Sequence, residues 1–214
     1  MGATRQPTTV RRGELVSAAL ELIATRGIAS LGTRSLAAQV GLSSGAIFKH
    51  FASLDALLMA VVDHVSEVLA ASLPDPALPP LERLAAFVER RSQAIGGRAH
   101  IQQLMLSEQF LLALPPGGAE KLGEQIDLTW RFVRQAVEEG QAVGRIRADL
   151  PARAAALVVL GTTQMLARSQ TQARLAAGEP RDVLTTLMAM LGPAAAPTTP
   201  TTNRPPRSPR RRTR

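Results

Sequence analysis

The sequence has no cysteine and no tyrosine, and only 3% of its 214 residues are aromatic. Without cysteine, the chain has no disulfide, no thiolate metal site and no cysteine nucleophile. The shortage of aromatic residues, with abundant Ala, Leu and Arg, favours helices over β-sheet. No apolar run is long enough to cross a membrane, and residues 1–12 lack the apolar stretch of a signal peptide. We therefore expect a soluble, cytoplasmic protein without membrane association.

The excess of positive charge lies at the two ends of the sequence. Nine of the 25 basic residues are Arg5, Arg11 and Arg12 at the start and six arginines between positions 204 and 214. The other 16 basic residues are balanced by 17 acidic ones. The net charge of +8 therefore describes the ends, and nucleic-acid binding has to be argued from local placement. The N-terminal arginines fit a solvated arm or a contact with the DNA backbone or minor groove. The C-terminal arginines fit a solvated tail or nonspecific attraction to DNA.

Apolar residues at helical spacing predict an all-α fold, with four helices in the first third of the chain. Gly27 and Gly41 are placed to end the first two helices. Ser43 or Ser44 can cap the third, and Ser53 can cap the fourth. The helices are predicted over residues 10–25, 33–40, 43–51 and 53–72.

Four prolines between residues 74 and 80 break any helix and predict a domain boundary. We therefore expect an N-terminal domain over residues 9–72 and a helical domain over residues 81–191. From residue 192 onward, Pro, Thr, Ala and Arg dominate, which predicts a disordered tail at 192–214. The helices expected in the second domain are 81–95, 98–114, 119–142, 151–177 and 179–191.

Residues 33–51, TRSLAAQVGLSSGAIFKHF, carry the most informative pattern. Two short predicted helices joined by the turn Gly41–Leu42–Ser43 form a helix-turn-helix. Gly41 supplies the left-handed backbone that such a turn needs, and small residues opening the second helix would let it enter a major groove. The same periodicity also fits an ordinary helical hairpin inside a bundle.

This segment resembles the DNA-binding region of the tetracycline-repressor (TetR) family. The resemblance rests on Gly27, Thr33, Gly41–Leu42–Ser43 and the ending Phe48–Lys49–His50–Phe51, and it extends over about residues 10–64. It implies a three-helix helix-turn-helix domain followed by a helical bundle for regulation and dimerisation. The implied function is that of a homodimeric transcriptional repressor, released from a double-stranded DNA operator by a small-molecule effector.

The resemblance also implies which residues contact DNA. The family usually has Tyr where this chain has Phe48, which lacks the hydroxyl that commonly contacts a phosphate. It also often has Lys where this chain has Leu54, before Asp55. The DNA-contacting residues are expected to be Thr33, Arg34, Ser43, Ser44, Gly45, Ala46, Phe48, Lys49 and His50.

In the second domain the resemblance is less specific. Residues 144–170 resemble the turn and penultimate helix that many family members use for dimer contact, although an intramolecular core helix fits the same pattern. The expected dimer residues are Leu157, Leu160, Gly161, Gln164 and Arg168. Bulky residues expected to flank an effector cavity, although such residues more often belong to a core, are Met105, Gln109, Phe110, Trp130, Phe132 and Met165.

Patterns that would indicate an enzyme are weak. Residues 41–45 match the G-x-S-x-G nucleophile elbow of hydrolases, but that motif needs a preceding strand and residues 34–40 are predicted to be helical. The three histidines, His50, His64 and His100, fall on different predicted helices without metal-ligand spacing. We expect no metal, no cofactor and no catalysis, with a helical-bundle enzyme or a non-DNA adaptor as the alternatives.

Overall fold

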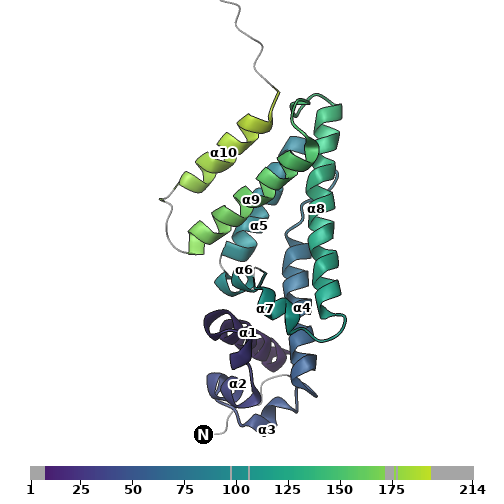
Figure 1. Cartoon of the computed structure of the whole chain (residues 1–214). Coiled ribbons are helices and arrows are strands. Elements are labelled where there is room, and N and C mark those ends of the chain that lie inside the picture. The colour runs from purple at the N-terminus through teal and green to yellow at the C-terminus, as the bar shows by residue number, and fades with distance from the viewer. Residues whose placement is uncertain (1–7, 97, 106, 172–175, 177, 194–214) are drawn as a thin grey trace, which may run out of the picture.

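The computed structural model describes residues 8–96, 98–105, 107–171, 176 and 178–193. This part of the chain is all-helical, as predicted, and has no strand. Figure 1 shows an elongated molecule, with α1–α3 at one end and α10 toward the other. None of these helices has the length and apolar character needed to cross a membrane. The helices are α1 (Thr8–Arg26), α2 (Thr33–Val40), α3 (Ser44–Ile47), α4 (Leu54–Ala71), α5 (Pro80–Gly96), α6 (Ala99–Met105), α7 (Glu108–Leu112), α8 (Gly118–Ala142), α9 (Ala152–Thr171) and α10 (Glu179–Leu191), with a 3-10 turn at Ile28–Ser30.

Local signals set the ends of the first helices. Gly41 follows α2 with a φ of 65°, a left-handed conformation that favours glycine. The Ser43 hydroxyl accepts a hydrogen bond from the Ala46 amide at 3.3 Å and caps α3. The Ser53 hydroxyl likewise accepts from the Ala56 amide at 3.1 Å and caps α4. The turn and both caps are therefore encoded within a few residues of sequence.

The third helix is shorter than predicted. It covers Ser44–Ile47 instead of reaching residue 51. The next amides close tight turns instead, since Lys49 donates to the Ala46 carbonyl at 3.3 Å and His50 to the Ile47 carbonyl at 2.9 Å. Such bonds, which span three residues, commonly tighten the last turn of a helix.

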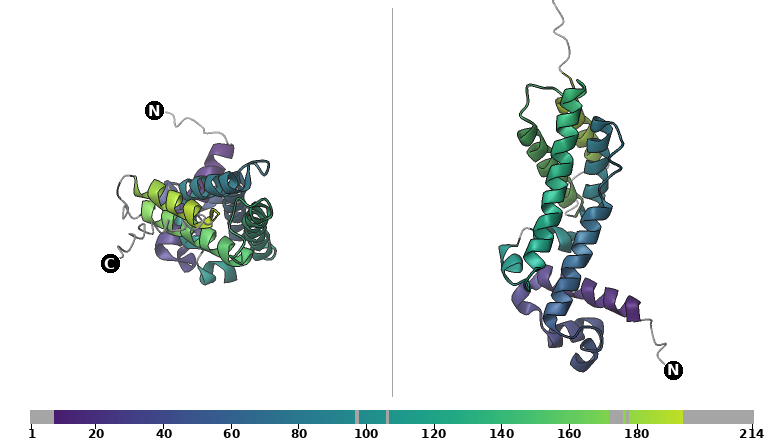
Figure 2. Two further views of the ribbon diagram at one scale, coloured as in Figure 1. Left: turned by 90° about the horizontal axis from the view of Figure 1, so that it is seen from above. Right: turned by 90° about the vertical axis from the view of Figure 1, so that its right-hand side faces the viewer.

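The upper part of the molecule is a bundle built on α5, α8 and α9. Its core contains Phe87 and Val88 of α5, Val133 and Val137 of α8, and Val159 of α9, all fully buried. Leu187 of α10 packs into the same core, and α10 lies along the outside of the bundle (Figure 2, left). The right-hand view of Figure 2 shows α8 running beside α4 and α5 for most of its length.

One apolar core joins the first four helices to the bundle. It holds Leu15 of α1, Leu36 of α2, Ile47 of α3 and a long row of residues of α4. The same cluster takes in residues of the second half: Ile95, Ile101, Leu104, Phe110 and Leu122. The helix-turn-helix end is therefore packed on α6, α7 and the start of α8, and does not hang from a free linker.

The helix predicted over residues 98–114 is two helices, α6 and α7. Ser107 separates them, because its hydroxyl accepts a hydrogen bond from the Phe110 amide at 3.2 Å and caps α7. The break turns Phe110 into the shared core, where it is fully buried. The predicted end of α9 at 177 and the tail at 192–214 fall largely outside the described residues.

An ion pair joins α5 to α8 inside the bundle. Arg83 is buried, and its Nη2 lies 2.6 Å from Oε2 of the partly exposed Glu139. The hydrogen bond from Arg83, with a second one from Gln135, lowers the pKa of Glu139 below its ordinary value. The lowered pKa means that the folded state favours the ionised carboxylate.

Replacing Glu139 with Gln should lower the melting temperature at pH 7, because buried Arg83 loses its counter-charge. A carboxyl group with a lowered pKa stabilises the fold above its ordinary pKa, and loses this effect as the pH falls through the lower, folded-state value. Circular dichroism melts should therefore show the two proteins converging in acid. Glu138→Gln, which removes the exposed pair with Arg134, is the control and should change little. Equal melting temperatures at pH 7 would contradict this role.

Candidate nucleic-acid interface and bundle cavity

The residues predicted to contact DNA lie together at the α2–α3 end of the molecule (Figure 1). Ile47 of α3 points inward and is buried, so the opposite side of this helix faces out. Thr33, Ala46 and His50 are half-buried. The exposed members of the predicted set are Arg34, Ser43, Ser44, Gly45, Phe48 and Lys49.

The two phenylalanines after α3 have different surroundings. Phe51 is buried in the shared core, whereas Phe48 is 52% exposed. The guanidinium of Arg12 lies 4.2 Å from the centre of the Phe51 ring and donates a hydrogen bond to the His50 carbonyl. Phe48 therefore belongs to the outer surface, and not to the small core of the helix-turn-helix.

Two of the three N-terminal arginines are bound to the fold. Arg12 braces the segment after α3 as just described, and Arg11 pairs with Glu14 at 2.7 Å. Neither arginine belongs to a free, solvated arm, because α1 already begins at Thr8. Arg5 lies outside the described residues. Nδ1 of His50 is buried without a hydrogen-bond partner, so any phosphate contact by this ring would use Nε2.

A cavity of about 260 Å³ lies inside the bundle, between α4, α5, α6, α8 and α9. Its apolar lining comes from all five helices, and its polar lining consists of Arg91, Thr129, Thr163 and Gln164. The apolar lining residues are Leu69, Phe87, Met105, Ile126, Trp130, Leu157 and Leu160, with Gly161 beside them. Within the described residues, no group of three or more His, Asp or Glu side chains could hold a metal ion.

The family model for bacterial regulatory proteins of the tetR family matches residues 15–61, which span α1 to the first turns of α4. Over this segment the chain resembles the TetR family. The matched residues contain the helix-turn-helix and the exposed surface described above. The α2–α3 end of the molecule therefore resembles the helix-turn-helix domain of tetR-family regulators. No curated protein matches the sequence.

Solved TetR-type regulators share the fold over nearly the whole described chain. The ketosteroid transcriptional regulator KstR2 of Mycobacterium tuberculosis is 21% identical, with a TM-score of 0.72 over 89% of this chain and 97% of that one. AibR, solved with isovaleryl coenzyme A and operator DNA, is 17% identical, with a TM-score of 0.67 over 86% and 98%. FadR from Bacillus subtilis, solved with stearoyl-CoA, is 18% identical, with a TM-score of 0.61 over 84% and 98%. At these identities, the likeness concerns the fold.

Only part of the predicted effector set lines the cavity. Met105 and Trp130 do. Gln109 is exposed, and Phe110 lies in the shared core because the Ser107 cap turns α7. Met165 is 62% exposed on the outer side of α9.

Phe132 packs against Phe87, with ring centres 6.3 Å apart, and does not line the cavity either. Spacing along a helix predicts which face of the helix a residue occupies. It does not predict which neighbouring element that face packs against.

The structure adds polar residues to the cavity that the sequence analysis did not select. Arg91 and Thr129 are both buried in its wall. A signal for Arg91 was present, since it follows Leu84, Phe87 and Val88 at helical spacing on the apolar stripe of α5. An arginine on a buried stripe needs polar or charged partners in the interior of the fold.

The α9 residues predicted for the dimer have mixed positions. Leu157, Leu160, Gly161 and Gln164 line the cavity, and Arg168 is exposed. Beside this row, large apolar side chains lie open on the outer face of α9 and α10. These are Val158, Met165 and Met190, together with the outer part of Leu157.

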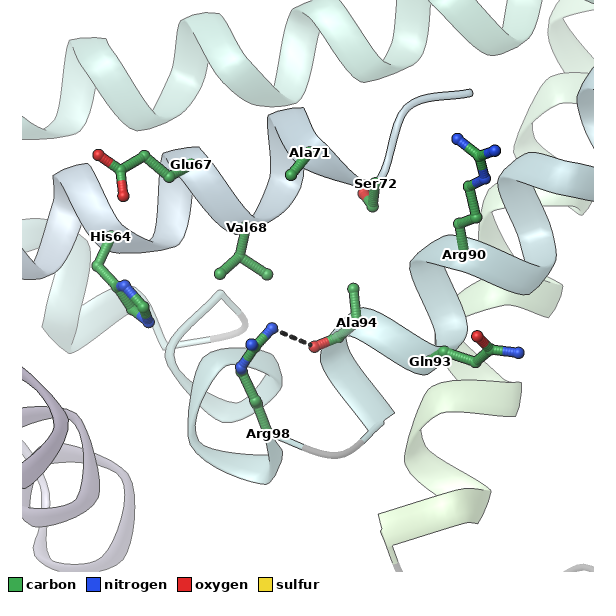
Figure 3. A pocket seen from close by; sticks show the side chains of 9 residues that line it. All are labelled: His64, Glu67, Val68, Ala71, Ser72, Arg90, Gln93, Ala94 and Arg98. Carbon is green, nitrogen blue, oxygen red and sulfur yellow. Dashed lines mark hydrogen bonds between the residues drawn. The ribbon is translucent and has the colours of Figure 1, made fainter. Parts of the chain in front are cut away.

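An open groove lies on the other side of α4, bordered by α5 and the start of α6 (Figure 3). It is lined by both signs of charge, with Glu67 on α4 and Arg90 on α5. Arg98, which lies below Val68 in this view, donates a hydrogen bond to the Ala94 carbonyl at 3.1 Å. Because it is open and lined by both signs of charge, we interpret this groove as a solvated feature of the surface.

Proposed function

We propose that this TetR-family protein is a homodimeric transcriptional repressor, released from its operator by a small molecule. The observation that carries the proposal is the combination of an exposed α2–α3 surface with an internal bundle cavity, joined through one core. Two copies of α3 would enter successive major grooves of a two-fold operator. In support, AibR has the same fold and was solved with both an acyl-coenzyme A and operator DNA.

Within this proposal, the residues of the α2–α3 surface divide by role. Ser44 and Ala46 would lie toward base edges and affect sequence preference, while Lys49 and His50 would contact phosphates. Thr33, Arg34, Ser43, Gly45 and Phe48 would border the same contact. The described residues that line the cavity include no carboxylate or histidine for acid–base chemistry.

Release would follow from differential binding to two arrangements of the dimer. A ligand held between α5, α8 and α9 would favour one spacing of the two DNA-binding domains. Helix α4 is the element suited to transmit the change, because it packs against α5 and α8 and also carries part of the helix-turn-helix core. Lys121 of α8 and Asp63 of α4, paired at 2.6 Å, mark one contact that such a movement would alter.

Lys49→Ala should weaken binding to specific and nonspecific DNA alike, since phosphates carry no direct sequence information. The dependence of log K on log salt should fall by about 0.9 per lost phosphate contact, or about twice that for a dimer. Fluorescence anisotropy with DNA from upstream of its own gene, at several salt concentrations, measures both effects. Arg131→Ala removes the same charge from an exposed position on α8 and is the control. An unchanged salt slope for Lys49→Ala would refute the phosphate contact.

Phe48→Tyr should strengthen binding, because it restores a hydroxyl on an exposed ring beside α3. One hydrogen bond contributes about 0.5–1.5 kcal/mol, so two protomers on one operator could gain about tenfold in affinity. The melting temperature should stay unchanged, since residue 48 is 52% exposed and the hydroxyl remains solvated. Unchanged or weaker DNA binding together with a lower melting temperature would disprove the outward placement.

The dimer is proposed to form through the outer faces of α9 and α10. Val158 and Met165 lie about two turns apart on the same side of α9, and both are at least half exposed. Met190 of α10 borders the groove between the two helices together with Val158. A contact of two helices from each protomer would bury on the order of 2,000 Å² in total, as in obligate dimers.

Met165→Glu should produce monomers in sedimentation velocity at micromolar concentration, because it places two charges in an apolar contact. This residue is a cleaner test than Leu160, which is half-buried and also lines the cavity. The control is Leu112→Glu, since Leu112 is 87% exposed on α7, away from α9 and α10. Wild-type protein that sediments as a monomer, or a Met165→Glu dimer, would contradict the interface.

A further inference from the structure

Arg91 is a buried cation in the wall of the bundle cavity. Arg91 is only 5% exposed. Its Nη2 donates to the Leu69 carbonyl at 2.9 Å and to the Thr129 hydroxyl at 3.2 Å. Its guanidinium lies 5.3 Å from the centre of the Phe87 ring, a cation–π contact. All of these partners are neutral, so the positive charge is solvated by the protein but not balanced.

Arg83, the other buried arginine of α5, does not share this lack of a counter-charge. On the same helix, buried Arg83 has a carboxylate partner in Glu139. Among the described residues, no ion pair includes Arg91. Burial lowers the pKa of Arg91 to about 10, which still leaves it charged at neutral pH. A buried charge without a counter-charge is costly, and its retention in a core needs a reason.

Two polar atoms of the cavity wall also lack hydrogen-bond partners. They are Nε of Arg91 and Oε1 of Gln164, and both are buried. The Arg91 atom is a donor, and a half-turn of the Gln164 amide would present a second donor in place of its oxygen. Native structures leave few buried polar atoms unpaired, and such atoms beside a cavity indicate an absent partner. The partner that suits two donors and a positive charge is an anion.

The other residues that line the cavity indicate the size and polarity of the uncharged part of that anion. Apart from the four polar residues, the wall is apolar, with Trp130, Leu160 and Met105 among its members. The volume of about 260 Å³ lies just below the 300–1,000 Å³ that is typical of ligand pockets. A ligand for this space is compact, mostly apolar and singly charged. A phosphate, with nearly two charges, is a poorer match for one guanidinium in an apolar wall.

We propose that the effector is a monocarboxylic acid with a compact apolar body, its carboxylate paired with Arg91 and its body enclosed by the apolar residues of the cavity. The inference rests on the proposed function and names the chemical class of the effector. An uncharged acyl tail would fill the volume but would leave the Arg91 charge and its Nε unpaired. A planar guanidinium pairs well with a carboxylate through two parallel hydrogen bonds. In Arg91 these would come from the free Nε and from Nη2, which would give up one of its present acceptors.

The position of Arg91 gives the ligand a route to the DNA-binding domain. The Leu69 carbonyl that Arg91 holds belongs to the last turn of α4, the helix that enters the core of the helix-turn-helix. A carboxylate on Arg91 draws the guanidinium toward the cavity and weakens its hold on that carbonyl. The ligand-free and ligand-bound forms of the protein would therefore differ in a contact to α4, as differential binding requires.

The test uses Trp130, which is the only tryptophan of the chain and lines the cavity. Its fluorescence is titrated in the full-length protein with straight-chain carboxylates from hexanoate to decanoate, and with 4-phenylbutyrate. Each acid is matched by its primary amide, which has the same shape and no charge. The expected result is saturable binding of at least one acid, about 10- to 100-fold tighter than its amide, as a charged hydrogen bond contributes.

Arg91→Met should remove the preference for acid over amide, whereas Arg91→Lys should keep part of it. Arg90→Met is the matched control, because Arg90 is exposed and borders the outer groove of Figure 3 instead of the cavity. The affinities of acid and amide are also compared on the wild-type protein, so this test does not depend on whether a variant folds. Equal affinity for acid and amide, or no saturable binding of any acid, would overturn the proposal.

DNA binding separates this inference from the function on which it rests. The acid that binds should release the protein from upstream DNA in the anisotropy assay, and its amide should not. If the protein binds DNA but only neutral molecules release it, the carboxylate inference fails and the repressor proposal stands. If the acid binds in the cavity but the protein does not bind DNA, the repressor proposal fails and the carboxylate site stands.

Discussion

Burial of the apolar face of α4 is the interaction on which the rest of the structure depends. At its start, Leu57, Leu58 and Val61 close the core of the helix-turn-helix. At its end, Leu69 lines the bundle cavity and gives its carbonyl to Arg91. One helix, buried along its length in one core, thus reaches both the DNA-binding surface and the candidate ligand site. Because packed cores resist gradual deformation, the proposed release would transmit a change at one end as a shift of the whole helix.

The two buried arginines of α5 show how similar residues acquire different roles. Arg83 and Arg91 are eight residues apart on one buried stripe, and each donates to a backbone carbonyl. Arg83 also has Glu139 and so completes a structural ion pair between helices. Arg91 has neutral partners only, and its free donor borders a cavity. The difference lies in what surrounds each charge, and it separates a structural residue from a candidate binding residue.

Helix α9 connects the cavity with the outer surface. One row of its residues, which includes Gly161 and Gln164, lines the cavity, and the adjacent row carries exposed Val158 and Met165. A ligand that moves the inner row therefore moves the surface through which we propose that two protomers associate. In the proposed dimer, this arrangement would make the spacing of the two DNA-binding domains sensitive to the content of the cavity, without any contact between ligand and DNA.

The sequence by itself determined what depends on neighbouring residues. The helical period, the turn at Gly41 and the caps at Ser43 and Ser53 all follow from interactions within one or two helical turns, and the TetR-type domain could be identified from them. The tertiary structure decided what depends on distant residues. It placed Phe110 in a core and Met165 on the surface, although both are bulky residues at helical spacing. It also bound Arg12 to the segment after α3, and left Arg91 without a counter-charge. Burial and pairing are set by residues tens of positions away, and no local pattern specifies them.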